Sequence, residues 1–360
     1  MSAPNRIAAT AVLAMGLASV PALAETPFYE GKTIEVLINY SAGGPTDVEA
    51  RLIARYLGKH IPGNPTIIAR NRAGAGGMIG MNYMADVAKP DGLTVAIFSP
   101  PVFTEVLGDA GLDTRFKDFV WLSSLAVPQI CYVRRDTPPG IEDPADLLQA
   151  ETFNASGIRP TSTHDIRMRL SLDVLGVDYN YVTGYKGLAG ASAAVLQNEA
   201  QYSCGSIASY RSSVVPSMVE TGIALPLFYY AVVDAEGNDV LDPSLPDIPT
   251  FRDYYRSVHG EDPSGEVYEV FEAVNNLKTS LQRGSFVPLG TPEEAVDALR
   301  QAWKALETDE EFLGAYEEAF QAKPVIAHGE ETMALIESLD DIDADLVSFL
   351  SDYIAAGSDN

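Results

Sequence analysis

Basic residues are scarce in this chain of 360 residues. The 24 Lys and Arg face 50 Asp and Glu, which gives a formal net charge of -26 at pH 7. A surface this acidic repels the phosphate backbone of a nucleic acid. The chain also contains no basic cluster of the kind that docks on anionic lipids. The composition therefore argues against nucleic acid and a bilayer surface as partners.

Cysteine is almost absent. Only Cys131 and Cys204 are present, so the chain is not a small disulfide scaffold. Each lies in a strand-like run, and the sequence leaves two alternatives open, a single bridge or two buried thiols. The distance between the two Cα atoms decides between them, and the sequence does not supply it.

Motifs for catalysis, metals and cofactors are also missing. The chain has no HExxH, GxSxG or GxxxxGK[ST] pattern, and its four histidines are scattered. Ser162, His164 and Asp165 superficially offer a catalytic triad, but neighbours at a helix start point in different directions. The glycine run 74–80 reads GxGxxxG rather than the GxGxxG of a dinucleotide fold. We therefore predict no enzyme activity, no metal and no cofactor.

No apolar run is long enough to span a membrane. Ile7 to Val20 is a mostly apolar stretch after Arg6, and Ala22-Leu23-Ala24 fits a small-x-small cleavage pattern. At 1.5 Å per residue this stretch reaches about 21 Å, short of the ~30 Å hydrocarbon core. We predict a signal peptide at 1–24 and a periplasmic protein.

Past residue 25, strand-like and helix-like segments alternate. The first strands are expected at 33–40, 66–70 and 93–98, with helices between them, and a second set of such units starts at 126. This rhythm predicts an α/β fold with mostly parallel sheets flanked by helices. The length of the chain favours two sheets in two lobes over one large sheet.

The segment SAGGPTD (41–47) joins the first strand to the first helix. Gly43 and Gly44 allow the backbone to approach a ligand closely, and Thr46 with Glu49 forms a capping-box pattern. Free amides at such a helix start attract a carboxylate or phosphate, even on an acidic protein. We predict a ligand site here, with the glycine run after the second strand as a wall beside it.

The series of motifs resembles the tripartite tricarboxylate transporter solute-binding proteins, the Bug or TctC-like family. The segments that carry this resemblance are SAGGPTD (41–47), NRAGAGGMIG (71–80), KPDGLT (89–94), TSTH (161–164), YKG (185–187), LPDIPT (245–250) and VPLGTPEE (287–294). Any one of them is weak, but seven in this order are specific.

The resemblance implies two α/β lobes of the periplasmic binding protein type (type II-like), joined by two crossover strands. The first lobe would comprise 25–125 and 230–360, and the second 126–229. Residues 254–284, which are acidic and partly helical, look like an insertion within the first lobe.

The resemblance also implies which residues face the ligand. They are Tyr40, Ser41, Ala42, Gly43, Gly44, Thr46, Asp47, Gly76, Ser99, Ser156, Arg159, Thr161, Ser162, Thr163, His164, Tyr185, Gly205 and Ser206. The chain departs from the usual pattern at Tyr40 and Ala42, and Gly205 stands where an Asp is common. Without that Asp an amino-acid ligand is disfavoured, because an ammonium group would want a carboxylate partner. Arg159 either pairs with a second ligand carboxylate or faces solvent.

The function implied is an extracytoplasmic binding protein for a di- or tricarboxylate or an aromatic carboxylate. Its partners would be that small organic acid and an integral-membrane permease pair of a small and a large subunit, and the protein would be a monomer without a cofactor. A sensory protein that reports the acid to a membrane histidine kinase is the alternative, and a secreted enzyme is a third reading.

Overall fold

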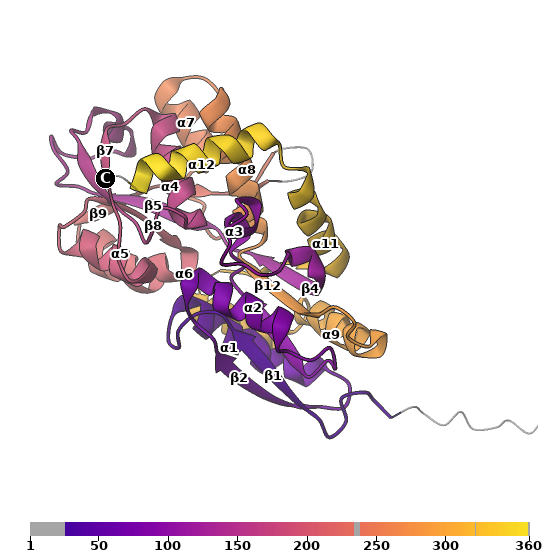
Figure 1. Cartoon of the computed structure of the whole chain (residues 1–360). Coiled ribbons are helices and arrows are strands. Elements are labelled where there is room, and N and C mark those ends of the chain that lie inside the picture. Colours follow the sequence, from indigo (N-terminus) through magenta and orange to yellow (C-terminus); the bar gives the residue numbers. More distant parts are fainter. Residues whose placement is uncertain (1–25, 234–237, 321, 359–360) are drawn as a thin grey trace, which may run out of the picture.

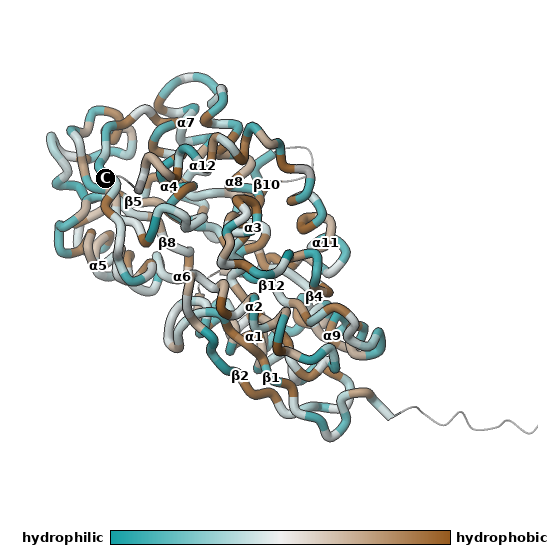
Figure 2. Tube along the Cα trace, viewed as in Figure 1, coloured by the Kyte–Doolittle hydropathy of each residue, from teal (hydrophilic) through white to brown (hydrophobic). Residues whose placement is uncertain are grey.

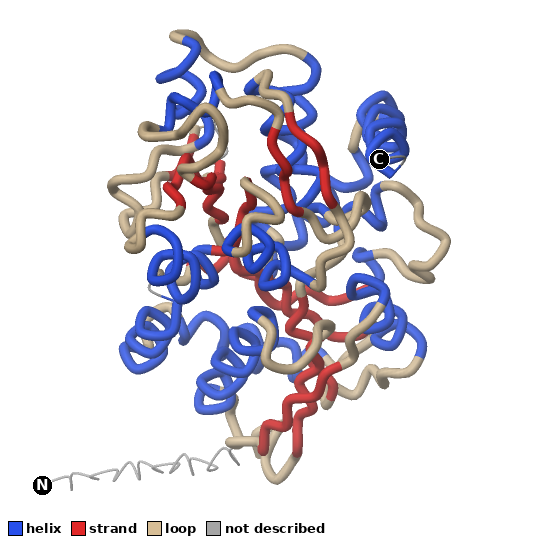
Figure 3. Tube along the Cα trace, turned by 90° about the vertical axis from the view of Figure 1, so that its left-hand side faces the viewer, coloured by secondary structure: helices blue, strands red, loops and turns tan. Residues whose placement is uncertain are grey.

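The computed structural model describes residues 26–233, 238–320 and 322–358. The predicted signal peptide lies outside these residues. The chain forms two main sheets with helices on both sides, as Figures 1 and 3 show from two directions. The predicted two-sheet α/β fold flanked by helices is therefore confirmed.

The first sheet has six strands in the order β13-β4-β12-β3-β1-β2. They are β1 (Thr33–Ile38), β2 (Thr66–Asn71), β3 (Thr94–Phe98), β4 (Phe119–Ala126), β12 (Arg283–Pro288) and β13 (Val325–His328). Exposed and half-buried residues alternate along β2, as expected for an edge strand, whereas all six residues of β12 are buried in the middle.

The second sheet has five strands in the order β7-β6-β8-β5-β9. They are β5 (Gln129–Arg134), β6 (Phe153–Ser156), β7 (Tyr179–Val182), β8 (Tyr202–Ser206) and β9 (Ala224–Tyr230). A short ribbon of β10 (Val232–Val233) and β11 (Asp239–Val240) follows β9.

Twelve α-helices lie among the described residues. They are α1 (Pro45–His60), α2 (Met78–Asp86), α3 (Val102–Val106), α4 (Thr163–Leu175), α5 (Gly187–Leu196), α6 (Ile207–Ser209), α7 (Phe251–His259), α8 (Glu266–Ser280), α9 (Glu293–Leu306), α10 (Glu310–Phe320), α11 (Gly329–Glu337) and α12 (Ala344–Ser358). Hydrophobic and hydrophilic residues alternate along the outer helices, as helices that bury one face require (Figure 2).

The sheets are mixed, whereas the sequence predicts mostly parallel ones. In the first sheet β2, β1 and β3 are parallel, while β12 pairs antiparallel with both β3 and β4. In the second sheet β7, β6 and β8 are parallel, and β5 is antiparallel to β8 and β9. In the first sheet β13 is also antiparallel to its neighbour β4. Periodicity within one strand carries no information on its neighbour's direction.

Helices α7, α8 and α12 pack on the second sheet and its helix α4. Arg167 of α4 hydrogen bonds to Asn275 and Thr279 of α8, and Arg169 donates to the carbonyl of Tyr353 in α12. Figure 1 shows α12 beside α4. The family resemblance implies that the whole of 230–360 belongs to the first lobe, whereas α7, α8 and α12 pack against elements of the second sheet. The exact lobe boundaries stay a prediction.

Cys131 and Cys204 are joined by a disulfide bond. The two residues face each other directly in the antiparallel pair of β5 and β8, with Cα atoms 4.0 Å apart. Both are buried. Of the two alternatives that the sequence leaves open, the structure has the bridge.

Candidate functional site

The strand ends of the first sheet collect at one edge. β1 and β2 end together at Ile38 and Asn71, which are paired in the parallel ladder. β12 runs the other way, so that Gly284 pairs with Phe98 and its first residue, Arg283, lies where β3 ends. The loops that leave β1, β2 and β3 therefore gather at this edge, together with the start of β12.

The second sheet presents the equivalent edge. Ser156 and Val182 end the parallel pair of β6 and β7, while Gln129, the first residue of β5, pairs with Ser206 at the end of β8. The chain passes from Ala126 of the first sheet to Gln129 of the second in three residues, a span of about 11 Å at most. The two edges are therefore neighbours, and they carry the loops in which the predicted site residues lie.

The first loop, 40–47, is held by Asp47. Its Oδ2 accepts the amide of Gly43 at 2.9 Å, and its Oδ1 accepts Asn71 Nδ2 at 2.7 Å and Arg51 Nε at 2.8 Å. Although burial alone would raise it, these donors lower the pKa of the Asp47 carboxyl. Asp47 is thus occupied within the protein, and the Gly43 amide that was predicted to be free is its partner. Both shape the loop instead of offering free groups to a ligand.

The predicted capping box of Thr46 and Glu49 does not form. Helix α1 begins at Pro45 after Gly44, with no side-chain hydrogen bond at its cap. Glu49 is buried and pairs with Arg283 at 2.7 Å, and it accepts the hydroxyl of Tyr316 at 2.6 Å. The Glu49 carboxylate therefore pairs with Arg283 of the distant β12 and does not accept a backbone amide at the start of its own helix.

The glycine run forms a wall beside this loop. Gly74, Ala75, Gly76 and Gly77 all have positive φ, between 44° and 135°, a conformation that glycine adopts without strain. Tyr40 donates its hydroxyl to the carbonyl of Gly76 at 3.1 Å. The first loop and the glycine run are therefore in contact.

Asn39 ties this wall to the end of β3. Its side chain donates to the carbonyl of Ser99 at 2.9 Å and accepts the Ser99 amide at 3.0 Å. A Cβ atom at Gly77 would lie 2.5 Å from Asn39 Nδ2, so only glycine fits there. Ser99 is buried, and this clamp uses its backbone groups.

The loop after β6 is held by Asp165, the third residue of α4. Asp165 Oδ2 accepts the amide of Ile158 at 2.5 Å, the amide of Arg159 at 2.9 Å and the hydroxyl of Tyr181 at 2.6 Å. A Cβ atom at Gly157 would lie 2.4 Å from the same oxygen. Burial raises the pKa of this carboxyl to about 6.

Arg159 reaches from this loop to the first sheet. A Cβ atom at Gly76 would lie 1.6 Å from Arg159 Nη2, so the guanidinium group lies directly on the glycine run. Burial raises the pKa of the Tyr40 phenol, while Arg159 and Arg283 act in the opposite direction, which puts both cations near that hydroxyl. In the described part of the chain Arg159 has no acidic ion-pair partner. The structure thus brings Tyr40, Gly76 and Arg159 together.

Several predicted site residues are buried inside the second lobe instead. Ser156 is fully buried, and its hydroxyl donates to the carbonyls of Ala191 and Tyr202. His164 is also buried, with Nδ1 3.0 Å from the side-chain oxygen of Gln129, and Thr163 has 9% of its surface exposed. Ser156 and His164 stabilise the lobe rather than presenting a side chain at the edge.

The remaining predicted residues lie in loops at the two edges. Ser41, Ala42 and Thr161 are exposed, and Ser162 precedes the first turn of α4. At the end of β8, Ser206 caps the short α6, where its Oγ accepts the Ser209 amide at 3.3 Å, and Ser209 Oγ lies 2.8 Å from a Cβ built on Gly205. The half-buried Tyr185 packs against the core cluster that contains Val195 and Tyr210.

Sequence reasoning missed Asn39, Asp165 and Arg283. Asn39 directly precedes Tyr40, and a polar residue at a buried strand end was an available signal. Asp165 was considered only as a member of a triad, although an acid at the third position of a helix after a glycine commonly reaches back to loop amides. Arg283 carries no local signal, because β12 reaches the site from far along the sequence.

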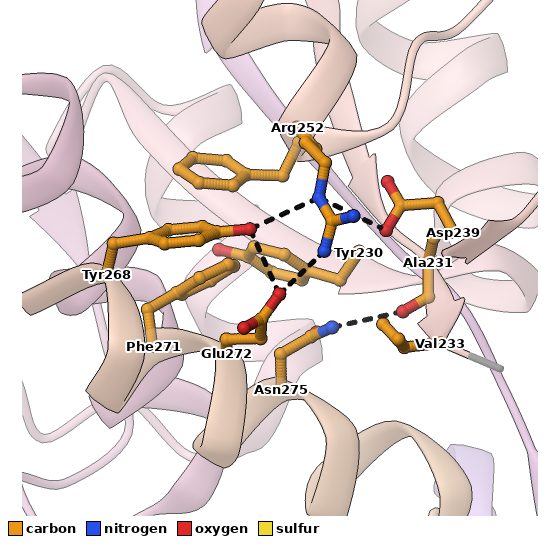
Figure 4. A pocket seen from close by; sticks show the side chains of 10 residues that line it. Tyr230, Ala231, Val233, Asp239, Arg252, Tyr268, Phe271, Glu272 and Asn275 are labelled. Carbon is orange, nitrogen blue, oxygen red and sulfur yellow. Dashed lines mark hydrogen bonds and ion pairs between the residues drawn. The ribbon is translucent and has the colours of Figure 1, made fainter. Parts of the chain in front are cut away.

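Two hollows in the described part of the structure lie away from these loops. A cavity of about 10 Å³ between β9, α7 and α8 has room for a single water molecule. Arg252 lines it and is neutralised by Glu272 at 2.6 Å (Figure 4). A larger hollow of about 450 Å³ lies along the proline-rich segment 241–250. None of the predicted site residues lines either hollow.

Within the described residues, no group of three or more His, Cys, Asp and Glu side chains is arranged to hold a metal ion. None of the helices in the described ranges is both long enough and apolar enough to cross a membrane.

The fold, two mixed sheets with helices on both sides, is similar to that of solved solute-binding proteins. A TctC solute-binding protein from Polaromonas has a TM-score of 0.60 and 24% identity, covering 91% of this chain and 99% of its own. MatC from Rhodopseudomonas palustris, solved with bound malate, has a TM-score of 0.60 and 22% identity over 90% and 99% of the two chains. A second R. palustris protein, solved with adipate, has a TM-score of 0.65 and 21% identity over 90% and 98%.

Curated proteins with UPF0065 and Bug names are similar in sequence to parts of this chain. A UPF0065 protein of Cupriavidus necator is 40% identical over 95 residues, which are 26% of this chain and 28% of that protein. A UPF0065 protein of Agrobacterium vitis is 28% identical over 62% of this chain and 61% of its own length. BugT of Bordetella pertussis is 35% identical over 26% and 28%. The chain is a homologue of these Bug and UPF0065 proteins, which confirms the family resemblance.

Each of these alignments covers less than two thirds of the relative's length. No family model matches the sequence.

Proposed function

We propose that this protein is a periplasmic solute-binding protein that captures a small organic carboxylate between its two sheets and delivers it to a tripartite tricarboxylate-type transporter. The partners would be the organic acid and a permease pair of one small and one large membrane subunit. The predicted signal peptide and the family resemblance support export and this mode of transport. Binding a solute requires no catalytic group. This agrees with the structural neighbours, which are binding proteins and not enzymes.

The observation that carries the proposal is the position of Arg159. Its guanidinium group lies on Gly76 beside Tyr40, between the two sheets, and has no acidic partner among the described residues. In a protein with a net charge of -26, a cation left without a carboxylate at the junction of two lobes is suited to an anionic ligand. A guanidinium can hold a carboxylate by two parallel hydrogen bonds.

Helix starts at both edges add further donors. Helix α1 begins at Pro45 on the first sheet and α4 at Thr163 on the second. Amides in the first turn of a helix have no partner within the helix, and the helix dipole favours a negative group there. We propose that Ser41, Ala42 and Thr46 on one side and Thr161 and Ser162 on the other frame the ligand.

The structural neighbours support the chemical class. MatC was solved with bound malate and the second R. palustris protein with adipate, and both ligands are dicarboxylates. An acid with two carboxylates could place one at the helix starts and the other on Arg159. We therefore expect di- and tricarboxylates to bind more tightly than monocarboxylates of the same length.

The test is a thermal-shift and calorimetric screen of the mature protein against malate, adipate, succinate, citrate and benzoate. A ligand at 100 times its dissociation constant should stabilise the protein by about 2.7 kcal/mol. Arg159→Gln should weaken binding of a dicarboxylate about tenfold to a hundredfold, because hydrogen bonds to charged groups contribute about 1.5–3 kcal/mol.

Arg55→Gln is the matched control. Arg55 is an exposed arginine on the outer face of α1, with its guanidinium over the Tyr56 ring. This variant should bind the acid as the unchanged protein does. Equal loss of affinity in both variants would show a general charge effect, and binding of sugars or amino acids alone would contradict the proposal.

A further inference from the structure

Asp165 holds the loop that carries Arg159 through hydrogen bonds within the protein, and these bonds form without a ligand. A single oxygen, Oδ2, accepts the amides of Ile158 and Arg159 and the hydroxyl of Tyr181, at 2.5, 2.9 and 2.6 Å. The residue is fully buried. Two consecutive amides of one loop are therefore fixed on a single carboxylate oxygen.

The contact is to the backbone of Arg159 and not to its charge. The guanidinium group lies on Gly76 of the other sheet, and the described structure contains no ion pair between Arg159 and Asp165. Asp165 therefore determines where the side chain of Arg159 starts, while leaving its positive charge available at the junction of the lobes.

The backbone at Gly157 packs closely against the carboxylate and the Tyr181 ring. A Cβ atom at Gly157 would lie 2.4 Å from Asp165 Oδ2 and also 2.4 Å from Tyr181 Cε2. Backbone, carboxylate and ring are packed so closely that only glycine fits at 157. The orientation of the loop is therefore coupled to the hydrogen-bonding state of Asp165.

The charge of Asp165 is poorly compensated. Tyr181 of β7 is neutral, with a pKa raised by burial and by Asp165 itself. Arg169, one turn further along α4, lies 5.0 Å from the Tyr181 ring centre and donates to the Tyr353 carbonyl of α12. Burial therefore dominates and raises the pKa of Asp165 to about 6, against the hydrogen bonds from Tyr181, the loop amides and the Ser162 hydroxyl.

We propose that Asp165 is a positioning residue whose ionised form holds Arg159 in place for the ligand, so that affinity for the acid falls when Asp165 takes up a proton. This inference rests on the proposed function. The physical reason is that all three donors point at one oxygen. A proton on Oδ2 would collide with them, and a proton on Oδ1 leaves a neutral oxygen that accepts more weakly.

The size of the effect follows from the population of the ionised form. With a pKa of about 6, about nine tenths of the molecules are ionised at pH 7 and about one tenth at pH 5. If only the ionised form holds Arg159, the apparent affinity falls about tenfold between these two pH values.

The first experiment needs no ligand. The amide resonances of Ile158 and Arg159 are followed by NMR in the mature protein between pH 4.5 and 8. Both should titrate with a common midpoint near 6, and Asp165→Asn should abolish the titration. Amides that do not titrate, or that titrate equally in the variant, would overturn the proposal.

The second experiment measures binding of adipate and malate by calorimetry at pH 7 and pH 5 in the unchanged protein, in Asp165→Asn and in Asp173→Asn. Ligand protonation affects all three proteins equally, so ratios between them isolate Asp165. The unchanged protein and Asp173→Asn should show an extra loss of about tenfold at pH 5 relative to Asp165→Asn. Asp173 is a suitable control because it lies on the same helix and bonds to Tyr179 rather than to the loop.

The two experiments separate the two proposals. Titrating amides in a protein that binds no acid would refute the proposed function but leave Asp165 as the residue that positions the loop. Tight acid binding with the same pH dependence in Asp165→Asn would support the function and refute the role of Asp165. If Asp165→Asn binds the acid about ten times more weakly than the unchanged protein at pH 7 without a lower melting temperature, the result supports positioning over a merely structural role.

Discussion

The loops that follow β1 and β6 are built on the same plan with different chemistry. In each, the third residue of the next helix is an aspartate that turns back to accept loop amides, Asp47 from Gly43 and Asp165 from Ile158 and Arg159. Both aspartates are buried. The two aspartates differ in the other groups that hydrogen bond to them.

Asp47 has a cation and an amide side chain as partners, Arg51 and Asn71, whereas the partners of Asp165 besides the loop amides are neutral hydroxyl groups, those of Tyr181 and Ser162. The pKa of Asp47 is accordingly lowered and that of Asp165 is raised to about 6. The comparison teaches that the same local device can be insensitive to pH in one lobe and sensitive in the other. The partners supplied by distant residues decide which.

The largest expected difference between the lobes concerns the disulfide, because the second sheet is cross-linked and the first is not. Cys131 and Cys204 are 73 residues apart, and a loop of that length corresponds to about 4 kcal/mol of stabilisation. Replacing both by alanine should lower the free energy of unfolding by about this amount, measured by urea denaturation. Hydrogen exchange should show faster opening in β5 and β8 than in β1 and β3. Uniform acceleration in both sheets would mean that the two lobes unfold as one unit.

The next effect has opposite sign in the two loops. A folded-state pKa raised from 3.8 to about 6 means that ionised Asp165 is disfavoured in the fold. The contribution of Asp165 to the free energy of unfolding therefore falls as the pH rises from about 4 through 6, by about 3 kcal/mol in total. For Asp47, whose pKa is lowered, stability is instead present above the unfolded pKa and lost as the pH falls below it.

Unfolding free energies of Asp165→Asn and Asp47→Asn between about pH 2 and 7.5 measure this difference. Relative to the unchanged protein, Asp165→Asn should gain stability as the pH rises from about 4 through 6, while Asp47→Asn should lose stability as the pH rises toward about 4 and change little above it. The same sign of pH dependence in both variants would contradict the comparison.

The smallest effect concerns the glycines of the two loops. Gly157 has no room for a Cβ atom, whereas Gly43 has open space around it but a φ of 79°. Gly157→Ala should cost about 2 kcal/mol through overpacking, and Gly43→Ala about 1 kcal/mol through backbone strain. Melting temperatures of the two variants test the order. If Gly43→Ala is the more damaging, then conformation matters more than packing in these loops.

Local patterns predicted the elements of this protein well. The strands predicted at 33–40, 66–70 and 93–98 are present with ends shifted by one or two residues. Apolar alternation and glycine runs are properties of neighbouring residues, so a single chain reveals them. The capping box at Thr46 failed because Glu49 found a stronger partner, Arg283, 234 positions further along the chain.

The amino-acid sequence by itself determined the acidic composition, the α/β rhythm, the glycine-rich turns and the family to which its relatives point. The tertiary structure decided the mixed direction of the strands, the pairing of the two cysteines, the packing of α7, α8 and α12 on the second sheet, and the contact of Arg159 with Gly76. These outcomes depend on which distant segments become neighbours and on how deeply each charge is buried. Sequence order alone specifies neither, because burial and pairing are properties of the assembled fold.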